Sequence, residues 1–201
     1  HEYFMYELHR TYKNKEEIFN LFLNTVNQDG IQIIDDFKFL EHEIPSSSYK
    51  VRTGGKVEKI EKSRKIVVPS VTVDDLSLSP NQLSEGTFKT LALVYYIIND
   101  ESQLLLIEEL EVCVHHGLLN SLIELIKIYS REKQIIISTH SDFVLDKLEP
   151  ENILLIKKEK GTQAKGLTKA LTKNEYSALK EYLEDSGNLG EYWKEGGFEK
   201  E

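Results

Sequence analysis

The chain has 201 residues, a length typical of one domain, and its 34 acidic against 25 basic side chains leave a formal charge of −9 at pH 7. Hydrophobic residues make up 40% of the chain, with only 4 prolines and 11 glycines, which excludes a collagen-like or wholly disordered protein. No apolar run approaches the roughly 18 residues of a membrane helix, and the single cysteine, Cys113, cannot form an internal disulfide, so we expect a cytoplasmic protein. The acidic balance argues against tight nucleic-acid binding by this stretch alone, but it does not exclude a basic partner surface.

The start of the chain predicts helical structure. Apolar residues at helical spacing predict an amphipathic helix over residues 14–28, with Asn14 and Glu17 placed as a cap pair. A strand is expected over residues 31–34. We therefore place a domain boundary after residue 30, between an N-terminal helical segment (1–30) and a main lobe (31–201).

The next part of the sequence predicts a β-hairpin. The pair Gly54-Gly55 indicates a turn between strand-like residues 49–52 and 57–60. The charged stretch from Lys56 to Lys65 predicts a solvated hairpin or loop.

After Ser84 the pattern changes to helices that alternate with short apolar runs, which is typical of an α/β sheet with crossover helices. The expected helices cover residues 87–98, 118–129 and 173–184, and the expected strands cover residues 104–107, 134–138 and 153–156. The runs at 104–107 and 135–137 are continuously apolar, which predicts central strands covered on both faces. Thr172 and Glu175 stand in capping-box positions before the last helix.

Two adjacent carboxylates, Glu108 and Glu109, follow the apolar strand 104–107. In open α/β sheets, ligands bind at the carboxyl ends of the strands. One carboxylate can hold Mg²⁺ through its water shell, and the next can orient and deprotonate an attacking water. The alternative interpretation is that the pair begins a solvated loop.

Polar segments on either side of this strand fit a phosphate ligand. Leu83–Lys89 is a glycine-containing turn that opens a helix, where free backbone N–H groups favour an anion, although an ordinary helix cap by Ser84 explains the same residues. Ser138–Asp142 follows the next apolar strand and includes His140. A lone histidine is usually structural, and the alternative interpretation is that His140, at the end of this strand, reaches the same ligand.

Together these segments resemble the C-terminal lobe of an ABC-type ATPase head. The branch is that of the RecF, RecN and SMC proteins and the OLD-like ATPases of bacterial phage-defence systems such as Septu, Gabija, PARIS and the retrons. Leu83–Lys89 resembles the signature motif, Leu104–Glu109 the Walker B strand, Glu111–His116 the D-loop and Ser138–Asp142 the switch-histidine segment. Residues 189–193 resemble the closing segment of the OLD-like group. The resemblance implies an α/β fold with a mostly parallel sheet flanked by helices, preceded by a β-rich and helical segment.

The resemblance also implies a head-to-tail homodimer around two ATP molecules. In such a dimer Ser84 and Gly86 of one subunit would contact the γ-phosphate of the ATP bound to the other, with Glu85 between them in the nucleotide-binding turn. Lys89 would support the signature helix.

The same resemblance implies an Mg-dependent ATPase. Glu108 would hold Mg²⁺ through water, Glu109 would polarise the attacking water, and His140 would contact the γ-phosphate. The implied partners are a second copy of the chain, an effector such as a nuclease or toxin, and DNA through other regions, with no membrane.

The sequence departs from the family pattern at several positions. Glu108 stands where relatives have Asp, and Leu110 and His116 stand where relatives often have Pro. No Gly-x-x-x-x-Gly-Lys-Ser/Thr motif occurs in the chain. We therefore expect the phosphate-binding loop to lie upstream of His1.

Other interpretations remain open. A repair ATPase of the RecF or RecN type is the nearest, and a non-catalytic scaffold derived from an ATPase is the next. A two-metal nuclease would need Asp35-Asp36 or Asp74-Asp75 to join the glutamates. A metal site at Glu111, His115 and His116 is weaker, because adjacent histidines do not face one way on a helix. Cys113 has no sign of a base beside it and is expected to be buried or idle.

Overall fold

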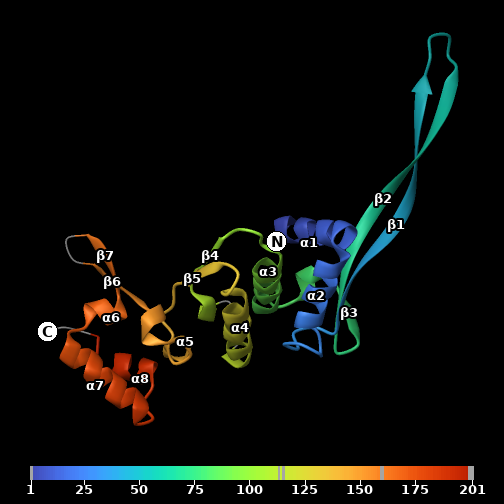
Figure 1. The fold of residues 1–201 in the computed structure, drawn as a ribbon. Helices are drawn as coiled ribbons and strands as arrows, with labels where there is room; N and C mark the ends of the chain where they lie inside the picture. Colours follow the sequence, from blue (N-terminus) through green and yellow to red (C-terminus); the bar gives the residue numbers. More distant parts are fainter. Residues whose placement is uncertain (1, 113, 115, 159–160, 199–201) are drawn as a thin grey trace. The chain divides into compact units, whose positions relative to one another are not determined.

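The computed structural model describes residues 2–112, 114, 116–158 and 161–198, and the chain divides into two compact units, His1–Gln103 and Leu104–Glu201 (Figure 1). Each unit contains both helices and strands, and the second contains a parallel strand pair, which confirms the predicted α/β class. The expected boundary after residue 30 lies inside the first unit and stays a prediction. No helix among the described residues is long and apolar enough to cross a membrane.

Three helices form the core of the first unit: α1 (Glu2–Asn14), α2 (Glu16–Val26) and α3 (Glu85–Asn99). Their contact faces bury Leu8, Phe22 and Tyr95 completely. The Tyr95 hydroxyl forms a hydrogen bond with the Thr11 hydroxyl at 2.8 Å inside this core, so the buried polar atom has a partner.

Helix α2 confirms the helix predicted over residues 14–28, but the predicted cap is wrong. Asn14 is the last residue of α1, and its side-chain amide donates to the Arg10 carbonyl. Lys15 occupies the N-cap position of α2, and its side chain forms no capping hydrogen bond. The cap pattern failed because a second helix, rather than an extended segment, comes before α2.

The strand predicted over residues 31–34 is also wrong, because this segment folds back over the end of α2. The amides of Ile31 and Ile33 donate to the carbonyls of Thr25 and Val26 at 2.8 and 2.9 Å. Gln32 has a φ of 57°, which an extended strand does not allow. The carbonyls at the end of α2 therefore accept hydrogen bonds from the amides of this segment, which are then not available for pairing in a sheet.

A long antiparallel hairpin extends from the first unit, as Figure 1 shows. It pairs β1 (Asp36–Val51) with β2 (Val57–Val73), and the short β3 (Leu76–Leu78) continues the sheet. The predicted turn is confirmed, with Gly54 and Gly55 at φ of 96° and 77°. Only the base of the hairpin reaches the core, through side chains such as Phe37 and Val71. The 3₁₀ helix η1 (Pro80–Gln82) then leads to α3.

The second unit begins with the predicted alternation of strands and helices. Its first elements are β4 (Leu104–Ile107), η2 (Leu110–Val112), α4 (His116–Tyr129), β5 (Gln134–Ile137) and α5 (Asp142–Leu145). Strands β4 and β5 pair in parallel, with Leu104 opposite Gln134 and Ile107 opposite Ile137.

The expectation that both faces of these strands are covered is wrong. Ile107 is buried, whereas Leu104, Leu106 and Ile136 are 46%, 65% and 40% exposed. The side chains of each strand alternate between the two faces, and the described structure covers one of them.

The rest of the second unit is a small α+β layer. It contains η3 (Pro150–Asn152), β6 (Leu154–Lys158), β7 (Thr162–Gly166), α6 (Leu167–Ala170), α7 (Lys173–Glu184) and α8 (Leu189–Lys194). Strand β6 confirms the strand expected near residues 153–156, but it pairs antiparallel with β7. The predicted capping box of Thr172 and Glu175 opens α7. Leu167, Leu179 and Leu189 meet in its core.

Candidate functional site

The candidate site lies at the carboxyl ends of β4 and β5. Because the two strands are parallel, their ends meet at one edge of the sheet. Glu108 and Glu109 follow β4, and Ser138 to His140 follow β5; Glu108, Glu109 and His140 are exposed. The Ser138 amide donates to the Ile107 carbonyl at 2.9 Å, which extends the pairing to the last residue before the glutamates. The structure thus brings the predicted residues of the two strand ends to one edge, while their roles stay predictions.

The backbone of Glu109 adopts an unusual conformation at this edge. Its φ is +46°, in the left-handed region that non-glycine residues rarely occupy. The Glu109 amide donates to the Ser138 hydroxyl, with 3.2 Å between nitrogen and oxygen. Such conformations persist where surrounding contacts hold them, and they gather at functional sites.

A carboxylate that the sequence did not single out as a positioning group, Glu111, fixes the segment after β5. It accepts a hydrogen bond from the Thr139 hydroxyl at 2.9 Å and another from the His140 amide at 2.6 Å. Thr139 in turn accepts from the Ser141 amide at 3.0 Å. From the sequence, Glu111 belongs only to the segment that resembles the D-loop and to a weak metal cluster. The one available signal was its position two residues after the glutamate pair.

These contacts affect the ionisation of Glu111. Partial burial raises the pKa of its carboxyl, but the hydrogen bonds from the His140 amide, its own backbone and the Thr139 hydroxyl outweigh burial, so the pKa lies below its usual value. Glu111 is therefore ionised at neutral pH and presents both oxygens as acceptors to the His140 segment.

The predicted signature residues belong to the first unit. Ser84 is the N-cap of α3, and its hydroxyl accepts from the Thr87 amide at 3.1 Å. Glu85 and Lys89 form an ion pair at 2.8 Å along the exposed face of the first turns, and hydrogen bonding to Lys89 lowers the pKa of Glu85. Gly86 lies in the first turn, where its carbonyl accepts from the Thr90 hydroxyl. The ordinary helix cap considered from the sequence is therefore present, and a contact with nucleotide stays a prediction.

The C-terminal segment resembling the OLD-like group packs on α5, directly after His140. The Gly190 amide donates to the Asp146 carboxylate at 2.6 Å, and Lys194 pairs with Asp142. A Cβ at Gly190 would lie 2.5 Å from the Asp142 carbonyl oxygen, so only glycine fits this contact. Helix α8 thus stabilises the helix that follows the candidate site.

The other predicted constellations gain no support from the described structure. No group of three His, Cys, Asp or Glu among the described residues could hold a metal ion. Asp36 pairs with Lys38, Asp35 accepts from Gln28, and all of the candidate nuclease aspartates lie in the first unit. Cys113 and His115 lie outside the described residues, as does the side chain of His116.

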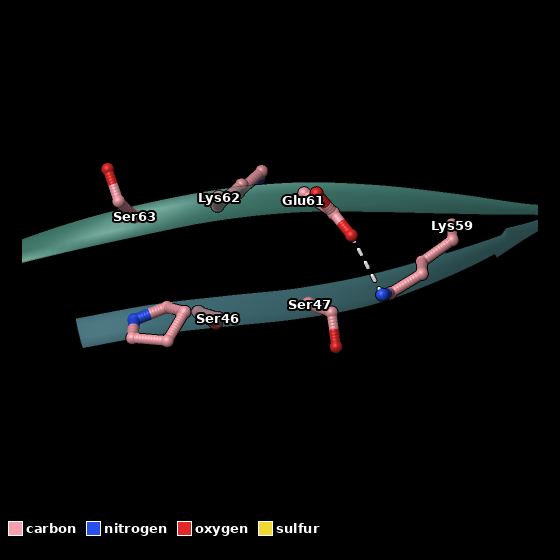
Figure 2. A pocket seen from close by; sticks show the side chains of 7 residues that line it. Ser46, Ser47, Lys59, Glu61, Lys62 and Ser63 are labelled. Atoms are coloured by element: carbon pink, nitrogen blue, oxygen red, sulfur yellow. Dashed lines mark hydrogen bonds and ion pairs between the residues drawn. The ribbon is translucent and has the colours of Figure 1, made fainter.

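A recess on the surface of the hairpin involves different residues (Figure 2). It is lined by Pro45, Ser46 and Ser47 of β1 and by Lys59, Glu61, Lys62 and Ser63 of β2. Lys59 and Glu61, two positions apart on β2, form an ion pair at 2.8 Å among these lining residues. The recess therefore belongs to the exposed ribbon and not to the edge that carries Glu108 and Glu109.

Comparison with known protein families decides the class. Residues 8–146 match the family described as "AAA domain, putative AbiEii toxin, Type IV TA system", and this match covers more than half of the chain. The chain belongs to this AAA domain family. AAA domains are nucleotide-binding ATPase domains, so the class expected from the sequence is confirmed at this level. The match includes both residues 83–89 and the β4–β5 edge.

Structural comparison aligns the chain with two solved SMC structures. One, an SmcHead bound to the C-winged helix domain of ScpA, aligns with a TM-score of 0.43 and 16% identity, over 63% of this chain and 39% of that one. The other comes from work on ATP-driven dimerization and DNA-stimulated activation of SMC ATPases, with a TM-score of 0.42 and 16% identity, over 67% and 80%. The chain thus spans well under half of the first structure. A comparison with curated proteins gives no match.

Proposed function

We propose that the chain is the C-terminal lobe of an ABC-type ATPase head of the RecF, SMC and OLD-like branch, which hydrolyses ATP and thereby controls an effector. Membership of an AAA domain family supports the binding of ATP in this proposal. The observation that carries the proposal is the hydrogen-bonded edge of β4 and β5, where two exposed glutamates and a histidine gather. The toxin named in the family's description supports an effector, and we place the protein in bacterial anti-phage defence on that basis.

In this proposal each residue at the edge has one task. Glu108 would hold Mg²⁺, Glu109 would orient and deprotonate the attacking water, and His140 would contact the γ-phosphate. The donor set fits, because exposed carboxylate oxygens are the ligands that Mg²⁺ prefers. When bound, Mg²⁺ neutralises the phosphate charge that develops during transfer.

The backbone at this edge supports the assignment of Glu109 as the base. A general base must be held within hydrogen-bond reach of its water, and a mobile side chain on a free loop would lose most of that advantage. The Ser138 hydroxyl holds the Glu109 amide, and the Glu111 carboxylate holds the His140 amide. The base and the histidine therefore rest on neighbouring, mutually bonded segments.

The phosphate-binding loop and the partner subunit complete the site in this proposal. The 201 residues hold no Gly-x-x-x-x-Gly-Lys-Ser/Thr motif, so the loop that cradles the phosphates comes from a further lobe. Ser84 and Gly86, at the start of α3, then meet the ATP of the second subunit, with Glu85 and Lys89 bridged beside them. ATP binding thus assembles a head-to-tail dimer.

The experiment is the Glu109→Gln variant of the natural protein, compared with Glu124→Gln. Glu124 is an exposed glutamate of α4 that pairs with Lys127, so its variant makes the same chemical change away from the edge. Loss of a positioned base should lower ATP turnover about 10²- to 10⁴-fold while ATP binding is retained, and the control should keep full turnover. Unchanged hydrolysis by Glu109→Gln would refute the assignment of Glu109 as the base, whereas a wild-type protein that binds ATP without hydrolysing it would leave the scaffold interpretation.

A further inference from the structure

The outer half of the β1–β2 hairpin carries a charge opposite to that of the chain. Residues 44–65 contain seven lysines and arginines and two glutamates, a net charge of +5 within a chain of −9. The strand residues in this stretch are exposed, apart from Ile60, which is half-buried. Figure 1 shows them extending as a two-stranded ribbon. A concentrated basic charge on an acidic protein indicates an anionic partner.

The strand register separates these charges onto two faces. In paired strands, directly opposed residues share a face, and the side chains of each strand alternate between faces. One face, which we name the basic face, carries the four opposed pairs Ile44–Arg64, Ser46–Lys62, Ser48–Ile60 and Lys50–Glu58. Arg52 continues it toward the tip. The opposite face carries Tyr49 with Lys59, Ser47 with Glu61 and Glu43 with Lys65.

The two faces differ in how their cations are neutralised. On the opposite face Lys59 pairs with Glu61 at 2.8 Å and Lys65 with Glu43 at 3.9 Å. On the basic face the one glutamate, Glu58, is bound by Arg52 at 2.7 Å. Within the described residues, no carboxylate lies at ion-pair distance from Lys50, Lys62 or Arg64. These cations therefore keep their charge available to a partner.

We propose that the basic face is a docking surface for the phosphate backbone of double-helical DNA. Its cations are interleaved with the hydroxyls of Ser46 and Ser48, and Lys, Arg and Ser are the side chains that contact phosphate oxygens. A two-stranded ribbon fits the major groove of B-DNA, which is about 12 Å wide. The turn at Gly54 and Gly55 keeps the tip of this ribbon narrow.

An acidic protein would recognise a different surface. Protein interfaces depend on buried aromatic and apolar anchors, and the most exposed apolar side chains of the outer ribbon, Tyr49, Val51 and Val57, lie on the opposite face. Of the apolar side chains, the basic face carries only Ile44 and the half-buried Ile60. The spacing of the side chains also favours DNA. Residues on the same face of one β-strand repeat about every 7 Å, which is close to the distance between successive phosphates along one DNA strand. Binding of this kind needs neither ATP nor Glu109, so it is independent of the proposed ATPase activity.

The test compares two double variants with equal changes in charge. Lys62→Gln/Arg64→Gln removes two cations of the basic face, and Lys59→Gln/Lys65→Gln removes two from the opposite face. Fluorescence anisotropy of a labelled 20-base-pair DNA duplex is recorded between 50 and 200 mM salt. Each phosphate contact contributes about 0.9 to the slope of log K against log salt, so wild-type protein should lose about tenfold more affinity over this range than the basic-face variant. The opposite-face variant should keep the wild-type slope.

Three results would overturn the proposal. The first is that wild-type protein does not bind the duplex at 50 mM salt. The second is an equal loss of affinity in both double variants, which would indicate general attraction rather than a face. The third is that polyglutamate displaces the duplex as well as unlabelled DNA does at equal charge, which would favour an acidic protein. Equal thermal unfolding of all three proteins confirms that the exposed substitutions leave the fold intact.

Discussion

Replacement of Glu111 tests the central contact of the candidate site. In Glu111→Ala the His140 amide and the Thr139 hydroxyl both lose their acceptor. In Glu111→Gln one amide oxygen remains to accept from the His140 amide, while the charge is removed. The two variants therefore separate the loss of the contact from the loss of its charge.

The magnitude follows from the two hydrogen bonds. A hydrogen bond to a charged group contributes about 1.5–3 kcal/mol, and two of them in a half-buried position should contribute about 2–4 kcal/mol in total. We expect Glu111→Ala to lower the free energy of unfolding by this amount and Glu111→Gln by about half of it. Because one factor of ten corresponds to about 1.4 kcal/mol, exchange of the His140 amide should accelerate about 30- to 1,000-fold in the alanine variant.

The contact also predicts a dependence on pH. The pKa of Glu111 is lowered in the folded protein, so the unfolded chain binds the proton more readily. The stabilisation is therefore complete above the ordinary glutamate pKa of about 4.5 and disappears as pH falls through the lower, folded-state pKa. Wild type and Glu111→Gln should differ in stability at pH 7 and converge in acid.

Urea unfolding at pH 7 and in acid, with amide exchange of His140, measures these effects. Glu124→Gln is the matched control, since exposed ion pairs contribute at most about 1 kcal/mol. The reasoning is refuted if Glu111→Ala unfolds within about 0.5 kcal/mol of wild type and leaves the exchange of His140 unchanged. It is also refuted if the difference between Glu111→Gln and wild type grows as the pH falls.

Two further predictions concern assembly and packing. In the proposed dimer Ser84 acts on the nucleotide of the other subunit, so Ser84→Arg should retain ATP binding but lose hydrolysis. Mixing Ser84→Arg subunits with Glu109→Gln subunits should restore partial activity, because one composite site then carries neither substitution. A mixture as inactive as its components would contradict action across the interface. Gly190→Ala should destabilise the protein by about 1–3 kcal/mol in urea unfolding, because the added Cβ would lie 2.5 Å from the Asp142 carbonyl oxygen. Gly161→Ala, where a Cβ would meet nothing within 4 Å, should change the stability little. Equal effects of the two variants would show that α8 does not pack closely on α5.

Local patterns determined most of the elements. The apolar runs at 104–107 and 135–137 identified β4 and β5, and the Thr172–Glu175 box identified the start of α7. The glycine pair identified the tip of the hairpin. These elements could be predicted from the sequence because apolar strand runs, capping boxes and glycine turns depend on residues only a few positions apart.

Errors arose where a local pattern competed with neighbouring structure. Asn14 has the chemistry of a cap, but α1 extends through it. Residues 31–34 have the composition of a strand, but the end of α2 uses their amides. In each case backbone hydrogen bonds had two possible partners, and packing of the helices decided between them.

The sequence by itself determined which polar residues follow each strand, and so it placed Glu108, Glu109 and His140 among the candidates. Only the tertiary structure decided that Glu111 holds the His140 amide and that Ser138 holds Glu109, because these pairs are 29 positions apart and meet through the parallel pairing of β4 with β5. It likewise decided which ribbon cations share a face. Contacts between distant residues depend on strand register, and register is set by the packing of whole elements rather than by any short stretch of sequence.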